Sequence, residues 1–200
     1  MSQDDTAIAT LVGSRICHDL ASPIGAIANG LELLALSSSG RSPELALVED
    51  SLRGARAALD ISRLAFGYAS GAENVSAEGL NAVLSAYYAG KPRLTLDCRL
   101  SGSLARAHAR VITLACLGIE TVLPRGGGLS ISGTPEATTI TATSEHLVAD
   151  TALWEGLQRD APLPADDPRH VQFHMLRHCL AARGMVLEHR VTANAFTITF

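Results

Sequence analysis

His18 is the residue in this 200-residue chain whose type and neighbours best suit chemistry. It lies in the run RICHDLASP (residues 15–23), inside an apolar-periodic segment from about Ile8 to Leu36. Asp19 can hold one imidazole nitrogen, which fixes the tautomer and leaves the other nitrogen as a nucleophile. The pair predicts a reactive histidine.

The segment around His18 has the period of an amphipathic helix. His18 lies roughly 200° around such a helix from both Ile16 and Leu20, so burying the apolar side turns the imidazole to solvent. Pro23, inside the pattern, costs about 3 kcal/mol or more in an isolated helix and predicts a bend beside His18. The apolar seam is Ile16, Leu20, Ile24, Ile27, Leu31 and Leu34.

The outward stripe of this helix is small or polar, so a bulky partner can approach the imidazole closely. We therefore predict a docking face at Ser22, Gly25 and Asn29, and we add Arg15 as a fourth partner-binding candidate. His18 and Asp19 are the predicted catalytic residues.

A second helix is expected after the break at residues 37–41. Ser42 suits the N-cap and Pro43 the first helical position, and the pattern runs to about Ala69. Residues near Asp4 and Asp5 can cap the first helix. Two apolar seams make an antiparallel hairpin, and a hairpin alone leaves apolar surface exposed, which predicts a homodimer closing a four-helix bundle. The second seam is Leu45, Val48, Leu52, Ala55, Leu59, Ser62 and Phe66.

The motif around His18 resembles a known family. His-Asp-Leu-x-Ser-Pro-Ile-x-x-Ile is similar to the phospho-acceptor box of dimeric histidine kinases, and the longer run from Cys17 to Leu34 resembles the ChpT-type histidine phosphotransferases. The resemblance implies that His18 carries a phosphoryl group.

A boundary is expected at residues 70–74, where helical periodicity stops. Residues 1–70 form the predicted dimerisation and phosphotransfer hairpin, and residues 75–200 form a second domain, so the fold class is α+β. Its expected helices cover 77–89, 103–123 and 168–183, with a short amphipathic helix around Trp154 and Leu157 over the sheet. Its expected strands are 93–100, 129–132, 138–143, 185–190 and 195–200.

This order resembles the ATP-binding domain of histidine kinases, a mixed sheet with helices on one face. The nucleotide motifs are degenerate: Gly118 stands where such kinases place a magnesium-binding Asn, with Glu120 the acidic residue nearby. Residues 144–150 lack the glycine pair that holds adenine, and Pro162, Pro164 and Pro168 replace a glycine-rich phosphate lid. We expect the fold to be kept without ATP binding, and no cofactor.

Other candidate sites are weaker. His170, His174 and His178 recur every fourth residue, a spacing that suits a metal, but their helix must also turn apolar residues to the sheet. Their role is left open. The four cysteines are scattered without a Cys-x-x-Cys pair and are expected to be mostly buried, reduced thiols.

Composition restricts the function classes. The formal charge is −4 and only 4% of the residues are aromatic, so neither a basic surface nor base stacking is expected and nucleic-acid binding is not predicted. The chain has no long uncharged apolar run and no basic leader, so neither a membrane span nor a secretory signal is predicted, and the cytoplasm is the expected compartment.

The sequence thus favours a histidine phosphotransferase that relays phosphoryl groups between receiver-domain aspartates, with magnesium supplied by the receiver. The ChpT-type resemblance further implies a receiver domain of a hybrid histidine kinase upstream and a response regulator of CtrA type downstream. A noncatalytic dimeric scaffold for receivers or kinases, and a diverged active kinase, are the alternatives.

Overall fold

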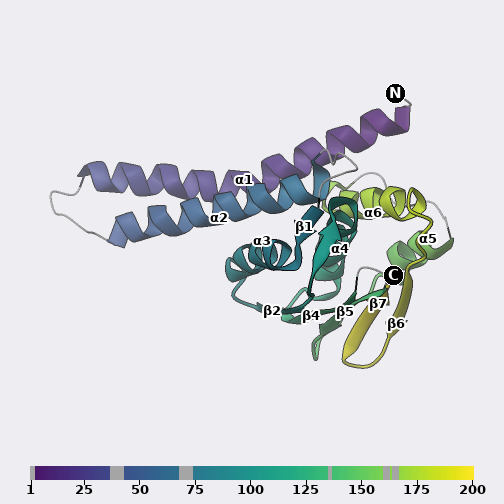
Figure 1. Ribbon diagram of the computed structural model, residues 1–200. Helices are drawn as coiled ribbons and strands as arrows, with labels where there is room; N and C mark the ends of the chain where they lie inside the picture. The colour runs from purple at the N-terminus through teal and green to yellow at the C-terminus, as the bar shows by residue number, and fades with distance from the viewer. Residues whose placement is uncertain (1–2, 37–42, 68–73, 135–136, 160–162, 164–166) are drawn as a thin grey trace.

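Two long helices open the fold. The computed structural model describes residues 3–36, 43–67, 74–134, 137–159, 163 and 167–200. Helices α1 (Gln3–Leu36) and α2 (Pro43–Phe66) run side by side as an antiparallel hairpin (Figure 1), as predicted. Helix α1 begins at Gln3, so Asp4 and Asp5 lie inside its first turn, and the residues that precede the helix lie outside the described residues. Ser42 lies outside the described residues.

Helix α1 continues without interruption through Pro23. Figure 1 shows its axis changing direction along its length, which fits the bend predicted from the proline. The two helices of the hairpin approach closely at Gly30, where an added Cβ would overlap the side chain of Val48. A larger residue at this position would require Val48 or the helices to shift.

An α/β domain follows the hairpin. Its elements, in chain order, are β1 (Asn74–Ser76), α3 (Ala77–Ala89), β2 (Leu94–Arg99), β3 (Ser103–Ala105), α4 (Arg106–Ile119), the 3-10 turn η1 (Glu120–Val122), β4 (Gly127–Thr134), β5 (Ala137–Thr143), α5 (Thr151–Arg159), the 3-10 turn η2 (Pro168–His170), α6 (Val171–Ala181), β6 (Glu188–Val191) and β7 (Ala195–Thr199).

Most expected elements are present, including the α5 helix around Trp154. The helix expected from residue 103 is wrong at its start, because Ser103–Ala105 pairs antiparallel with β1 and the helix begins only at Arg106. Gly102 precedes this strand with a φ of +83°, a conformation that glycine adopts without strain. The domain boundary predicted at residues 70–74 lies mostly outside the described residues.

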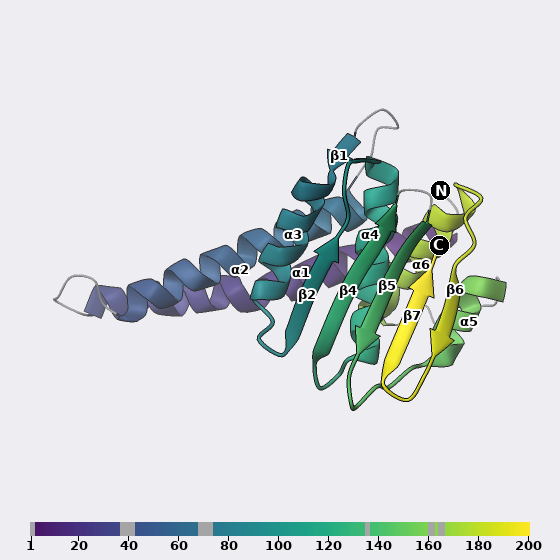
Figure 2. The same cartoon turned by 60° about the horizontal axis from the view of Figure 1, so that its bottom comes forward.

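The main sheet has five strands in the order β2-β4-β5-β7-β6, with β2 and β4 parallel and the other pairs antiparallel. Figure 2 shows the helices gathered behind one face of this sheet. Along β5, buried residues alternate with more exposed ones, as in a strand that covers a core on one side only. The predicted mixed sheet with helices on one face is confirmed.

The hairpin and the α/β domain share one hydrophobic core. The second half of α2 contributes Ala57, Ile61, Leu64 and Ala65 to the same cluster as α4 and the sheet. Arg110 on α4 also donates from Nε to the Ala65 carbonyl at 2.8 Å. These contacts fix the base of the hairpin on the domain (Figure 1). None of the described helices is both long and apolar enough to cross a membrane.

Candidate phosphotransfer site

His18 lies near the middle of α1 with its side chain 76% exposed. Its Nδ1 lies 3.2 Å from Oδ1 of Asp19. When Nδ1 carries the proton it donates to this carboxylate, and Nε2 keeps its lone pair on the exposed side of the ring. The structure thus gives His18 the orientation that the sequence predicted for a nucleophile.

Asp19 is held on its other side by Arg15. Arg15 Nε donates to Asp19 Oδ2 at 2.7 Å, one helical turn away, so the two carboxylate oxygens have different partners. The Arg15 side chain is 13% exposed. Burial acts to lower the pKa of this guanidinium, but the hydrogen bond and charge of Asp19 outweigh it and raise the pKa. Arg15 is therefore a permanent, partly buried cation that needs acceptors.

Those further acceptors come from the α/β domain. Arg15 Nη1 donates to the Arg169 carbonyl at 3.3 Å and to Oε1 of Gln172 at 3.5 Å. Gln172, in the first turn of α6, is 1% exposed and donates from Nε2 to the Leu117 carbonyl at 3.4 Å. Gln172 could not be predicted from the sequence, because no local pattern links it to a residue 157 positions earlier.

Arg15 was predicted to bind a partner, and that role stays a prediction. In the free chain its guanidinium is turned toward Asp19 and η2. The other three partner-binding candidates, Ser22, Gly25 and Asn29, are exposed. A Cβ added to Gly25 would meet no atom within 4 Å, so the surface beside His18 is open. The predicted outward stripe is present, and its function in docking remains untested.

A groove of about 360 Å³ runs beside this stripe, between α1, α2 and α3. Asp19 and Ser22 line its α1 side, and Tyr87 and Lys91 line its α3 side. Lys91 forms an ion pair with Glu120 and lies 4.3 Å from the centre of the Tyr87 ring. Burial acts to lower the pKa of Lys91, but Glu120 more than compensates and raises it, so Lys91 stays protonated and its charge is paired with that of Glu120.

Helix α1 presents three separate faces, which follow from about 100° of rotation per residue. Gly30 marks the face against α2. Ile24 and Leu31 lie about 100–120° to one side of it, and both side chains are more than half exposed. The stripe from His18 to Asn29 lies about 80–140° to the other side. An exposed apolar surface and His18 thus occupy different sides of one helix.

Two aromatic side chains pack closely against Gly118. A Cβ on Gly118 would lie 3.3 Å from Trp154 and 3.4 Å from Phe173. Trp154 and Phe173 are fully buried, and their ring centres are 5.0 Å apart in an edge-to-face arrangement. Glu120, the nearby acidic residue, pairs with Lys91. A longer polar side chain at Gly118 would need these rings to move.

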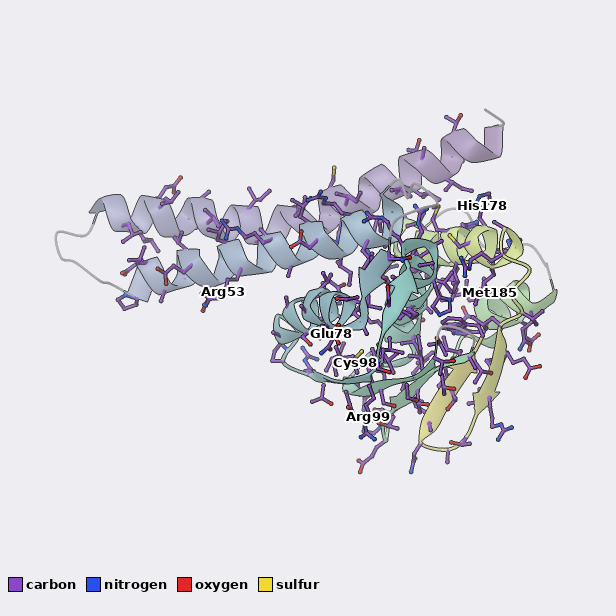
Figure 3. The ribbon with its side chains drawn as sticks, in the orientation of Figure 1. Arg53, Glu78, Cys98, Arg99, His178 and Met185 are labelled. Atoms are coloured by element: carbon purple, nitrogen blue, oxygen red, sulfur yellow. The ribbon has the colours of Figure 1, made fainter. Side chains whose placement is uncertain are left out.

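The histidines of α6 and the cysteines show no second site. Within the described ranges, no group of three or more His, Cys, Asp and Glu residues is arranged to hold a metal ion. His178 lies on the outer side of α6 (Figure 3). Cys116 and Cys179 are buried and Cys98 is partly buried, whereas Cys17 is exposed, which corrects the expectation for that residue.

Comparison with known proteins defines the class. The family model described as the histidine phosphotransferase C-terminal domain matches residues 77–195. The chain belongs to this family.

Two individual relatives, one curated protein and one solved structure, support this membership. The protein phosphotransferase ChpT of Brucella abortus (strain 2308) is 34% identical over 127 residues, which cover 62% of this chain and 59% of that protein. A solved structure of a bacterial phosphotransferase matches all of this chain and 97% of its own, with 27% identity and a TM-score of 0.81. A histidine kinase from Burkholderia phymatum STM815 matches at 15% identity and a TM-score of 0.43, over 93% of this chain and 96% of its own. The resemblance found in the sequence to ChpT-type histidine phosphotransferases is confirmed.

Proposed function

We propose that this chain is a histidine phosphotransferase that relays phosphoryl groups between receiver-domain aspartates through His18, without using ATP. The observation that carries the proposal is the exposed imidazole whose Nδ1 is held by Asp19. Membership of the histidine phosphotransferase family, matched over residues 77–195, supports the same class of reaction.

The chemistry follows from that orientation. His18 Nε2 attacks the phosphorus of a receiver phospho-aspartate in line, so that a P–N bond forms as the P–O bond breaks and the aspartate leaves as a carboxylate. Nε2 carries no proton to lose, and the proton on Nδ1 stays in the hydrogen bond to Asp19. A second receiver aspartate reverses these steps. A magnesium ion bound by the receiver screens the phosphoryl charge, so this chain supplies no metal ligand.

The proposed partners are other signalling proteins and a second copy of the chain. We assign the donor to the receiver domain of a hybrid histidine kinase and the acceptor to a response regulator of CtrA type, on the ChpT-type resemblance. The relay belongs in the cytoplasm, with no nucleic acid and no membrane as partner. A homodimer would cover Ile24 and Leu31 of α1 together with Leu52 and Leu59 of α2, which are 43–55% exposed in the single chain.

The packing around Gly118 supports a relay without ATP. A kinase needs room and polar ligands for a nucleotide and its metal, and here Trp154 and Phe173 pack against that position. Calorimetry with ATP and magnesium should therefore detect no binding. Incubation with labelled ATP should leave His18 unmodified, and strong autophosphorylation would instead favour a diverged kinase.

Transfer from a phosphorylated receiver tests the relay directly. The protein should take up acid-labile, base-stable phosphate from the receiver, and His18→Ala should take up none while still binding it. His178→Ala is the matched control, because it removes another exposed histidine and should leave transfer unchanged. Binding without transfer in the unsubstituted protein would support the scaffold alternative and refute the relay.

A further inference from the structure

We propose that Gln172 is a positioning residue for phosphoryl transfer at His18, acting through Arg15 and Asp19. The inference rests on the proposed function, since it concerns the efficiency of the same site. It makes the α/β domain part of that site even though this domain carries no reacting group.

The contacts form one continuous path from the core to the imidazole. Gln172 is fixed at its buried end by the Leu117 carbonyl, 3.4 Å from its Nε2. Its Oε1 faces Arg15 Nη1 at 3.5 Å. Arg15 Nε then holds Asp19 Oδ2 at 2.7 Å, and Asp19 Oδ1 lies 3.2 Å from Nδ1 of His18. Exposure along the path rises from 1% for Gln172 to 76% for the His18 side chain.

Arg15 has a long side chain on the surface of a helix, and without a rigid hydrogen-bond acceptor it can adopt many rotamers. Holding such a side chain in one rotamer costs conformational entropy. The Arg169 carbonyl and Gln172 Oε1 both accept from Nη1, which fixes the plane of the guanidinium and aims Nε along the helix at Asp19. Gln172 is suited to this task because it is buried and both ends of its amide are engaged.

The orientation of Asp19 in turn decides which imidazole nitrogen reacts. With Oδ2 held by Arg15, Oδ1 stays beside Nδ1 of His18 and favours the tautomer whose free nitrogen is Nε2. When Arg15 loses its anchor, Asp19 gains rotamers in which this hydrogen bond is absent. The fraction of His18 in the reactive tautomer then falls, although neither His18 nor Asp19 has changed.

Gln172→Met tests this path because methionine fills a similar volume without an amide. Gln158→Met is the matched control, since Gln158 is exposed on α5. Three quantities are measured in the full-length protein: the His18 tautomer from imidazole nitrogen-15 shifts at a pH where the ring is neutral, the transfer rate at saturating receiver, and the receiver Kd. Arg15→Met breaks the same path from α1 and serves if Gln172→Met fails to fold.

We expect Gln172→Met and Arg15→Met to move His18 toward the Nε2-protonated tautomer. The saturating transfer rate should fall at least about tenfold in both variants, and Gln172→Met should leave the receiver Kd unchanged. Gln158→Met should match the unsubstituted protein. If the His18 tautomer and the transfer rate were unchanged in Gln172→Met, or in Arg15→Met, the positioning role would be overturned. The proposed relay through His18 would still stand. An unsubstituted protein that accepts no phosphate at His18 would instead overturn the proposed function.

Discussion

The hairpin and the α/β domain differ in how completely they bury their residues. Helix α4 buries eleven of its fourteen residues. In the 34-residue α1, Gly30 is the one residue that is fully buried among those whose burial is described. Figure 3 shows the same contrast, with side chains crowded between the sheet and its helices and sparse along the free end of the hairpin.

This difference separates two tasks. The α/β domain buries most of its apolar side chains in one core, which the second half of α2 completes. The hairpin carries the exposed imidazole of His18 and leaves Leu31 and Leu52 about half exposed, as expected for the proposed docking and dimer surfaces. On the α1 side the two parts meet at Arg15, which donates hydrogen bonds to the Arg169 carbonyl and to Gln172 of the α/β domain.

The largest expected effect is on the core of the α/β domain. Trp154→Ala should lower the free energy of unfolding by about 3–5 kcal/mol, because the indole is fully buried between Phe173 and Phe196. Urea unfolding followed by circular dichroism measures this loss. Val186→Ala is the control in the same domain, since that side chain is 72% exposed, and it should change stability by less than about 0.5 kcal/mol. An equal loss of stability in the two variants would contradict the dense packing inferred for the core of the α/β domain.

A bulky substitution on the exposed stripe beside His18 should reduce phosphoryl transfer without reducing stability. Gly25→Leu should slow transfer from a receiver by about a hundredfold, because the added side chain keeps the partner away from in-line geometry. The substitution meets nothing in the chain itself, so helix content and dimerisation should be unchanged. Rapid-quench transfer kinetics give the rate.

Gly13→Leu is the matched control for this experiment. Gly13 lies on the same helix, is equally free of neighbours within 4 Å, and points about 140° away from His18. It should leave transfer near the unsubstituted rate. If both variants slow transfer alike, the effect belongs to the helix and not to a docking stripe.

The sequence predicted the parts of this molecule that depend on local patterns. The seam of α1, the exposure of His18 and the contact with Asp19 all follow from residues within one or two helical turns. The strands β5 and β7 alternate with period two and were placed within one residue at most ends. Short-range periodicity and neighbouring residue types suffice for such features.

The parts that were missed depend on contacts between distant residues. Ser103–Ala105 reads as the start of a helix until its pairing with Asn74–Ser76 is known. Gln172 has no local feature that sets it apart from other polar residues of a helix. Its role appears only when folding places η2 and α6 against α1 and brings Oε1 to Arg15. Tertiary packing, and not local propensity, decides both cases.

The exposed apolar side chains of the hairpin predict a dimer. Truncating one of these side chains should weaken the dimer moderately. Leu31→Ala should raise the dimer dissociation constant by about 10- to 150-fold, the equivalent of the 1.5–3 kcal/mol gained by burying a leucine. Leu33→Ala removes the same side chain at a similar exposure, 49% against 54%, but roughly 200° around the helix. It should leave the dimer intact. Light scattering over a concentration series measures both, and a monomeric unsubstituted protein would refute the dimer.

The smallest expected effect concerns η2, where the two regions touch. The Asp167 carboxylate accepts from the Arg169 guanidinium at 2.7 Å and from the Arg169 backbone N–H at 2.8 Å. These bonds lower the pKa of Asp167 from 3.8 to about 2. Because the folded value lies below the unfolded one, this stabilisation is fully present above about pH 4 and is lost as the pH falls toward 2.

A titration of the Asp167 carboxyl by carbon-13 NMR should therefore show a midpoint near 2. Arg169→Gln removes the side-chain partner but keeps the backbone N–H, so the pKa should rise only part of the way toward 3.8. The Arg169 carbonyl that accepts from Arg15 belongs to the backbone and is retained, so the His18 tautomer should be unchanged at neutral pH. A shifted tautomer in this variant would mean that the Asp167–Arg169 pair also holds Arg15 in place, and the link between the two regions would then be wider than the path through Gln172.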